Sequence, residues 1–146
     1  MTKGDKLAYC ALQWLNTPYV HNAKIKGVGV DCARLVVGAC EDAGLIEKEG
    51  LKLDDYSNEW HLHRQEDIMQ RIANEYCVEV HDLRRGDILL FKYGRVCSHA
   101  AIYLGDDMVI HSYIDKGTVI SSLKESIFYT RNGRKRLQHV YRFKEE

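Results

Sequence analysis

The sequence predicts a single α+β domain in which amino-terminal helices pack on a carboxy-terminal antiparallel sheet. Apolar residues recur at helical spacing in the first half of the chain, whereas short β-rich runs separated by turn residues fill the second half. Helices followed by antiparallel strands are typical of this fold class. The chain has 146 residues, 45% of them hydrophobic, which is enough for a core, and no repeat or linker divides it. We therefore expect one domain over residues 1–146.

The first helix is expected over residues 7–15, where apolar side chains recur every three or four positions. Thr2 and Asp5 precede it at the spacing of a capping box. Pro18 is expected to end this helix, because proline disfavours helical geometry in the residue before it. Residues 21–30 contain two glycines and show no period, so they are predicted to form an ordered loop.

A second helix is predicted to begin at Asp31, a good N-cap residue, and to end at Gly44. A polar loop follows from Gly50. A third helix is expected over residues 68–76, where apolar side chains again share one face.

Five strands are predicted in the second half, separated by YG, GDD, DKG and NG turns. They cover residues 86–93, 95–104, 108–113, 118–121 and 137–143. Strands joined by tight turns pair antiparallel, so the second and third of these runs should lie side by side.

The charge balance argues against binding to nucleic acid or to an anionic membrane as the main function. Lys and Arg number 21, and so do Asp and Glu, so the chain has no overall field of one sign. A basic turn at residues 131–136 is predicted to be a solvated hairpin, with contact to an anionic polymer or a partner protein as the alternative. Charges at Lys3, Asp5 and Lys6 leave no apolar stretch for a signal peptide, so synthesis in the cytoplasm is expected.

The five cysteines are expected to be free thiols. An odd number without any CxxC spacing argues against both a disulfide framework and a zinc ribbon. They are Cys10, Cys32, Cys40, Cys77 and Cys97.

Cys32 has the position of a reactive thiol. It directly follows the predicted N-cap Asp31, so it lies in the first helical turn, where unpaired N–H groups and the helix dipole stabilise a thiolate. The preceding GVGV segment gives backbone or substrate room to approach. The alternative is that Cys32 begins the apolar stripe of its helix and is simply buried.

Two histidines are candidates for the base that such a thiolate needs. His99 interrupts an apolar strand and His111 interrupts the next one, so the two rings can meet across the pair. Alone, each is more typical of a core or surface histidine. Strand alternation places Cys97 on the face of His99, where a disulfide to Cys32 would make activity sensitive to oxidation. A small buried filler is the alternative reading of Cys97, and the burial habits of cysteine favour it.

Two segments, TPYVHNAKIKGVGVDCARLV and GDILLFKYGRVCSHAAIYLGDDMVIHSY, resemble the NlpC-type cysteine peptidases of the papain-like superfamily. The resemblance extends roughly from Asp5 to Tyr113 and implies a papain-like fold without cofactor or metal. It implies that Cys32 is the nucleophile, His99 the general base and acid, and His111 the polar third member of the triad.

The resemblance also implies substrate-binding residues around the nucleophile. Tyr19 matches a family tyrosine near the nucleophile, and Asp31 matches the pocket-shaping residue before it. The family commonly has DCSG here, whereas this chain has Ala33 and Arg34. The missing hydroxyl at Ala33 and the added cation of Arg34 are expected to affect specificity.

The implied substrate is a peptidoglycan stem peptide, cleaved at the bond from D-glutamate to the diamino acid. The alternatives are an N-acetylmuramoyl-alanine amidase or acyltransferase on the same site, and a catalytically silent structural protein of a phage tail tip. Residues 55–64 resemble a branch found in tailed phages and gene-transfer agents. This implies tail proteins as partners and a location in the virion, with action in the periplasm or cell wall.

The same segment contains Trp60 beside the pair His61 and His63. The resemblance favours Trp60 as part of the substrate groove. Metal binding by the two histidines is the weaker alternative, because a structural zinc site needs four ligands and no partner spacing appears.

Overall fold

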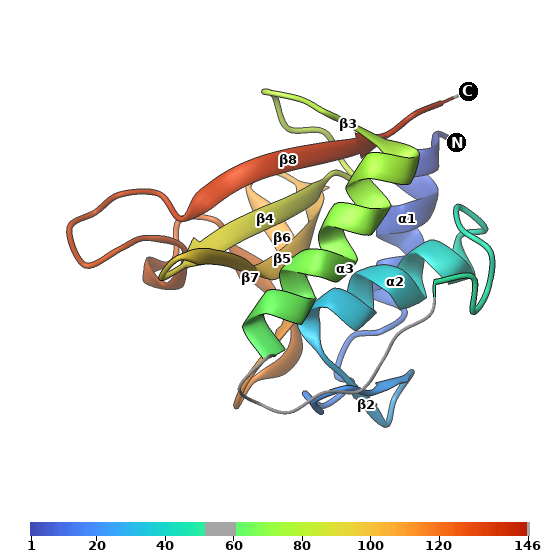
Figure 1. Ribbon diagram of the computed structural model, residues 1–146, viewed down its shortest axis with the longest axis horizontal. Helices are drawn as coiled ribbons and strands as arrows, with labels where there is room; N and C mark the ends of the chain where they lie inside the picture. Colours follow the sequence, from blue (N-terminus) through green and yellow to red (C-terminus); the bar gives the residue numbers. More distant parts are fainter. Residues whose placement is uncertain (52–60, 146) are drawn as a thin grey trace.

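The computed structural model describes residues 1–51 and 61–145, with side chains described from residue 65 onward in the second range. Three helices, α1 (Lys3–Leu12), α2 (Cys32–Asp42) and α3 (His61–Tyr76), gather on one side of a curved sheet (Figure 1). This arrangement confirms the predicted α+β class. The two termini lie near each other, and the Lys3 ammonium donates to the Lys144 carbonyl at 2.6 Å. Within the described ranges, none of the helices has the length and apolar character needed to cross a membrane.

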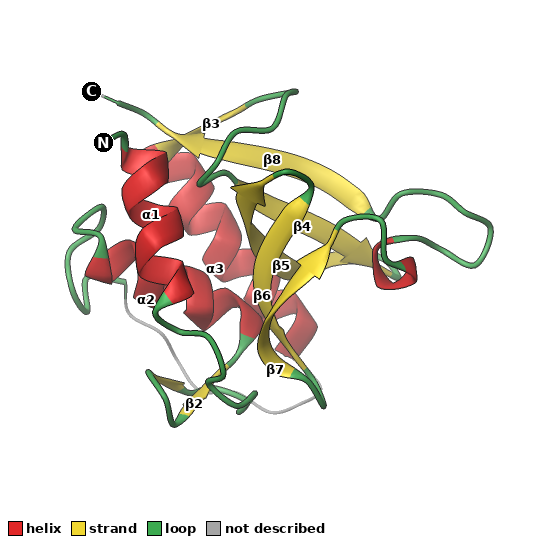
Figure 2. Ribbon diagram, turned by 180° about the vertical axis from the view of Figure 1, so that it is seen from behind, coloured by secondary structure: helices red, strands yellow, loops and turns green. Residues whose placement is uncertain are grey.

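The main sheet has six strands in the order β3-β8-β4-β5-β6-β7, and every neighbouring pair is antiparallel. Its strands are β3 (Cys77–Glu79), β4 (Ile88–Tyr93), β5 (Val96–Gly105), β6 (Met108–Tyr113), β7 (Gly117–Ser122) and β8 (Leu137–Phe143). The five predicted strands are confirmed, and β3 is an additional edge strand paired with β8. A short 3-10 helix, η2 (Ser126–Phe128), lies in the long connection before β8 (Figure 2).

Helix α1 begins as predicted but ends earlier. Thr2 and Asp5 form the capping box, with the Asp5 amide donating to the Thr2 hydroxyl at 3.0 Å. The helix ends at Leu12 rather than at Pro18. The reason is a turn that closes with Asn16 in the left-handed region, at φ 69°, where its amide donates to the Thr118 carbonyl at 3.0 Å. The chain therefore leaves helical geometry before the proline acts on it.

The segment expected to be a loop before α2 contains a small hairpin, β1 (Lys24–Ile25) with β2 (Gly29–Val30). Gly27 forms its turn at φ 79°, a conformation that favours glycine. Gly29 packs directly against the Val20 side chain, so it allows the hairpin to lie close to the segment that precedes it. The hairpin was not predicted because its strands are too short to show a two-residue period.

Helices α2 and α3 lie where two further helices were predicted. Asp31 is the N-cap of α2, and its carboxylate accepts from the Arg34 amide at 2.9 Å. Gly44, at φ 72°, follows the C-cap of this helix, as predicted. Helix α3 begins at His61, several residues before the expected start, so the end of the predicted polar loop is helical.

Two apolar clusters lie on opposite faces of the sheet. The first packs the helices on the sheet and includes Leu7, Val36, Ile72, Leu90 and Ile102. The second lies on the other face and includes Leu89, Phe91, Ala101, Tyr103, Val109, Phe128 and Val140. The alternation along β4 and β5 thus supplies both clusters, and the sheet is covered on each side.

Candidate active site

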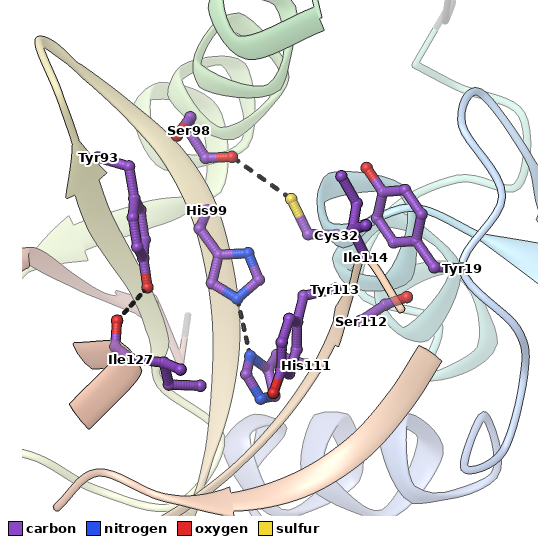
Figure 3. A pocket seen from close by; sticks show the side chains of 10 residues that line it. All are labelled: Tyr19, Cys32, Tyr93, Ser98, His99, His111, Ser112, Tyr113, Ile114 and Ile127. Carbon is purple, nitrogen blue, oxygen red and sulfur yellow. Dashed lines mark hydrogen bonds between the residues drawn. The ribbon is translucent and has the colours of Figure 1, made fainter. Parts of the chain in front are cut away.

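A cavity of about 300 Å³ opens where the start of α2 meets strands β5 and β6. Its walls are formed by Tyr19, Cys32, Tyr93, Ser98, His99, His111, Ser112, Tyr113, Ile114 and Ile127 (Figure 3). Four residues singled out in the sequence, Tyr19, Cys32, His99 and His111, therefore face the same space.

Cys32 is the first residue of α2, and its side chain is 3% exposed. Its sulfur lies 3.4 Å from the Gln65 Oε1 atom of α3 and 3.5 Å from the Ser98 carbonyl oxygen of β5. Both neighbours are acceptors, so each can accept the single S–H proton of the protonated thiol. The two acceptors within reach of this proton are Gln65 and Ser98, and His99 lines the same cavity as the sulfur (Figure 3).

The expected lowering of the Cys32 pKa does not occur in this structure. Burial, followed by the charge of Asp31, raises the pKa of the thiol to about 12, and this outweighs the backbone N–H groups near the sulfur. The helix start does act in the predicted direction, because the Ala33 and Cys32 amides lower the pKa. Desolvation is the larger effect because the Cys32 side chain is buried.

His99 and His111 are directly hydrogen-bonded, with 2.7 Å between His99 Nε2 and His111 Nδ1. The prediction that the two rings meet across neighbouring strands is confirmed. The other nitrogen of the His99 ring lies on the side of Cys32 (Figure 3). The rings of Tyr93 and Tyr113 stand edge-on to His99, with centroids 6.0 and 6.3 Å away.

Ser121 continues this chain of hydrogen bonds. His111 Nε2 lies 2.9 Å from the Ser121 hydroxyl oxygen on β7, and both side chains are buried. Burial lowers the pKa of His111 to about 4, and burial together with His111 lowers the pKa of His99 to about 3. Both rings are therefore neutral near pH 7, and each carries one ring proton.

A second hydrogen bond fixes α2 relative to the histidines. The Ser112 hydroxyl, next to His111 in β6, donates at 3.0 Å to the carbonyl of Val30, two residues before Cys32. The backbone of Tyr19 forms an isolated parallel β-bridge with Val30, and Tyr19 lines the cavity wall. The approach to α2 is thus tied to the strand that carries one of the two rings.

The other predicted substrate-binding residues have different positions. Asp31, Ala33 and Arg34 are 0%, 0% and 2% exposed and stand outside the cavity lining. The Arg34 guanidinium pairs with the Asp31 carboxylate at 2.9 Å and donates to the Asn22 side chain at 3.2 Å. It therefore holds the hairpin segment to α2 rather than pointing into the cavity. Trp60 lies outside the described residues.

Cys97 does not share the face of His99. The pairing of β4 with β5 slips between Phe91 and Tyr93, so that Cys97 and Ser98 both stand opposite one residue of β4. This bulge turns the Cys97 side chain toward the helix-side cluster, where it is a free, buried thiol. The structure thus supports the buried-filler reading, and the bulge also aims the Ser98 carbonyl at Cys32.

Two buried polar residues of the site, Gln65 and Ser121, were not predicted from the sequence. Gln65 lies on the apolar face of α3, in helical phase with Ile68, Met69 and Ile72, and is 1% exposed. A glutamine within an apolar stripe is a usable signal of a buried polar contact. Ser121 carries no comparable signal, because serine is ordinary in an edge strand.

Comparison with known proteins identifies the family of the chain. Residues 16–136 match the NlpC/P60 family. A gamma-DL-glutamyl hydrolase of Bacillus subtilis is 35% identical over 94 residues, which cover 62% of this chain and 21% of that protein. The murein DD-endopeptidase MepS/murein LD-carboxypeptidase of Escherichia coli is 39% identical over 44 residues, covering 30% of this chain and 23% of that protein. The chain thus matches less than a quarter of the length of each of these relatives.

Solved structures share the fold. The NlpC/p60 domain of the peptidoglycan hydrolase SagA has a TM-score of 0.61 at 19% identity, covering 96% of this chain and 98% of that one. A NlpC/P60 family protein from Bacillus cereus has a TM-score of 0.64 at 20% identity, covering 96% of this chain and 40% of that one. With the match over residues 16–136, the chain belongs to the NlpC/P60 family.

Proposed function

We propose that this protein is a cysteine peptidase that hydrolyses an amide bond in the stem peptide of peptidoglycan. The observation that carries the proposal is the single cavity that holds Cys32 together with the hydrogen-bonded pair His99 and His111. A thiol, a base and a group that orients the base are what nucleophilic cleavage of an amide requires. The hydrolase names of two family relatives point in the same direction.

The reaction begins with proton transfer from the Cys32 thiol to His99. The sulfur then attacks the carbonyl carbon, and the backbone N–H of Cys32 at the start of α2 stabilises the oxyanion. His99 returns its proton to the leaving amine, which departs and leaves a thioester on Cys32. His99 next takes a proton from water, the resulting hydroxide attacks the thioester, and the acid product leaves as the thiol is restored.

The hydrogen-bond chain determines which nitrogen of each histidine ring carries the proton. To accept the thiol proton at Nδ1, His99 must carry its own proton at Nε2 and donate it to His111 Nδ1. His111 then carries its proton at Nε2, where the Ser121 hydroxyl accepts it. We assign His111 and Ser121 as positioning residues that hold His99 in this tautomer.

For the substrate, we propose the bond between D-glutamate and the diamino acid. The B. subtilis relative is named for hydrolysis of a gamma-glutamyl bond, which has the same chemistry on its glutamyl side. Tyr19, Tyr113 and Ile114 line the cavity, which supports assigning them to contact with the stem peptide. Asp31 and Arg34 act indirectly in this proposal, by holding the hairpin segment against α2.

A phage-tail role is a separate proposal. It rests on the resemblance of residues 55–64 to the tail-associated branch, and residues 55–60 lie outside the described part of the chain. Trp60 lies in the same segment, and its proposed role as a wall of the substrate groove rests on the same resemblance. Mass spectrometry of purified phage or gene-transfer-agent particles tests the tail role, since a tail protein must copurify with the particle. Absence of the protein from intact particles would contradict the tail role and leave the hydrolase proposal standing.

The hydrolase proposal is tested by digesting defined muropeptides with the wild-type protein and with Cys32→Ser, and by identifying the fragments by mass. We expect one cleaved amide, between D-glutamate and the diamino acid, with the wild type and none with the variant. Release of an intact stem peptide from the sugar would indicate an amidase instead. Recovery of every muropeptide uncut, from a protein with native circular dichroism, would indicate a catalytically silent relative.

A further inference from the structure

Gln65 contacts the nucleophile from a helix that the reaction does not otherwise use. Its Oε1 atom accepts a hydrogen bond from the Ala33 amide at 2.8 Å and lies 3.4 Å from Cys32 Sγ. The Ala33 N–H can only donate, so the oxygen of the Gln65 amide group is the end that faces the start of α2. Gln65 is 1% exposed, so water does not compete for these contacts.

Both acceptors beside the sulfur favour its protonated form. A carbonyl oxygen binds S–H but repels a thiolate, because its lone pairs and the anion carry the same sign of charge. The Ser98 carbonyl, at 3.5 Å, is the second such acceptor. The sulfur of Cys32 therefore meets oxygen lone pairs on two sides, from α3 and from β5.

Gln65 also competes for the donor that would stabilise the anion. In the first turn of α2, the Arg34 amide is bound to the Asp31 carboxylate, and the Ala33 amide is bound to Gln65. These N–H groups are the ones that make a helix start attractive to a thiolate. One side chain thus offers a repulsive oxygen to the sulfur and shares the Ala33 N–H, one of the backbone donors that favour the thiolate.

We propose that Gln65 is a positioning residue that keeps Cys32 in the thiol form in the free protein. Thiolate formation then depends on His99 taking the proton, rather than on the helix start alone. The inference rests on the proposed function only in naming Cys32 as the nucleophile. It concerns the protonation of the sulfur, which can be measured without any substrate.

The test compares Gln65→Met with Gln65→Glu, two replacements of similar size and opposite effect on the sulfur. Methionine removes the carbonyl acceptor and releases the Ala33 N–H, so the Cys32 thiolate should become easier to form. Glutamate keeps both acceptor contacts and adds negative charge, so the thiolate should become harder to form. A side chain that only fills space would give no such pair of opposite changes.

The measurement is the rate of iodoacetamide alkylation of Cys32 at pH 8, resolved by peptide mass spectrometry. Cys10 on α1 serves as the reference thiol within each sample. We expect alkylation of Cys32 to be about tenfold faster in Gln65→Met and about tenfold slower in Gln65→Glu than in the wild type. Circular dichroism and the melting temperature check that each variant is folded.

Slower or unchanged alkylation in folded Gln65→Met would overturn the proposal, and so would faster alkylation in folded Gln65→Glu. If the methionine variant fails to fold, the glutamate variant alone decides by the direction of its change. An inactive protein whose Cys32 shows the expected order of rates would contradict the hydrolase proposal and leave this one intact.

Discussion

The buried His111 ring predicts a specific loss of stability in acid. Its side chain is 0% exposed, and burial lowers its pKa from 6.5 to about 4. The unfolded chain therefore binds this proton first as the pH falls. The stabilising contribution is complete above pH 6.5 and is lost progressively as the pH falls from 6.5 to about 4. For this shift, the loss between pH 7 and pH 5 is about 2 kcal/mol.

The variant His111→Gln removes the titrating group but keeps side-chain polar atoms at this position. Urea unfolding at pH 7 and pH 5 should show that the free energy of unfolding falls by about 2 kcal/mol less in the variant than in the wild type. In thermal unfolding the same difference corresponds to roughly 4–8 °C. His81→Gln, at an exposed loop position, is the matched control and should retain the wild-type pH dependence.

Equal losses of free energy in His111→Gln and the wild type between the two pH values would refute this role of the buried ring. The same change in the exposed control would refute it as well. Differences at pH 7 alone do not bear on the question, because they report packing and hydrogen bonding rather than proton uptake.

Three further predictions concern activity and stability. His111→Gln should retain measurable hydrolysis of a muropeptide and His99→Ala should not, because orienting a ring is replaceable and moving a proton is not; equal losses in kcat would count against these roles. Gly86→Ala should lower the free energy of unfolding in urea by about 1–3 kcal/mol more than Gly94→Ala does. Both glycines have positive φ, but only at Gly86 would the added Cβ meet the backbone of α1. Asp31→Asn should cost about 3 kcal/mol by the same measurement, because it removes the charge of a buried carboxylate that pairs with the Arg34 guanidinium at 2.9 Å. A loss below about 1 kcal/mol would contradict that account.

The parts of the fold that were predictable are those set by local chemistry. The capping box of α1 and the N-cap of α2 follow from side chains that bond to amides two or three residues away. The strands β6 and β8 have the predicted bounds because turn residues end each apolar run. The meeting of His99 and His111 follows from the tight GDD turn, which makes their strands neighbours.

Other features depend on contacts between distant segments and were missed for that reason. The edge strand β3 exists because it pairs with β8, more than 50 residues later in the chain. The bulge in β5 reverses the direction of Cys97, and a strict two-residue period cannot reveal an inserted residue. The raised pKa of Cys32 likewise depends on how fully the rest of the protein covers the helix start.

The candidate active site, too, could be predicted only in part. Residue type and spacing indicated a thiol at a helix start and two facing rings. They did not indicate that the Arg34 side chain folds back onto Asp31, because an arginine near a nucleophile is equally compatible with a substrate contact. Ser121 and Gln65 reach the site from β7 and α3, and only the packing of these elements identifies them.

In the proposed reaction, Cys32 forms a thioester with the stem peptide and His99 moves the protons. Rapid acid quenching of a muropeptide digest, followed by peptide mass spectrometry, measures this intermediate directly. We predict an acyl group on the Cys32 peptide in the wild type, with the mass of the amino-terminal part of the cleaved stem, and no acyl group in Cys32→Ala. Cleavage of the same bond by folded Cys32→Ala, at a rate near that of the wild type, would contradict the account.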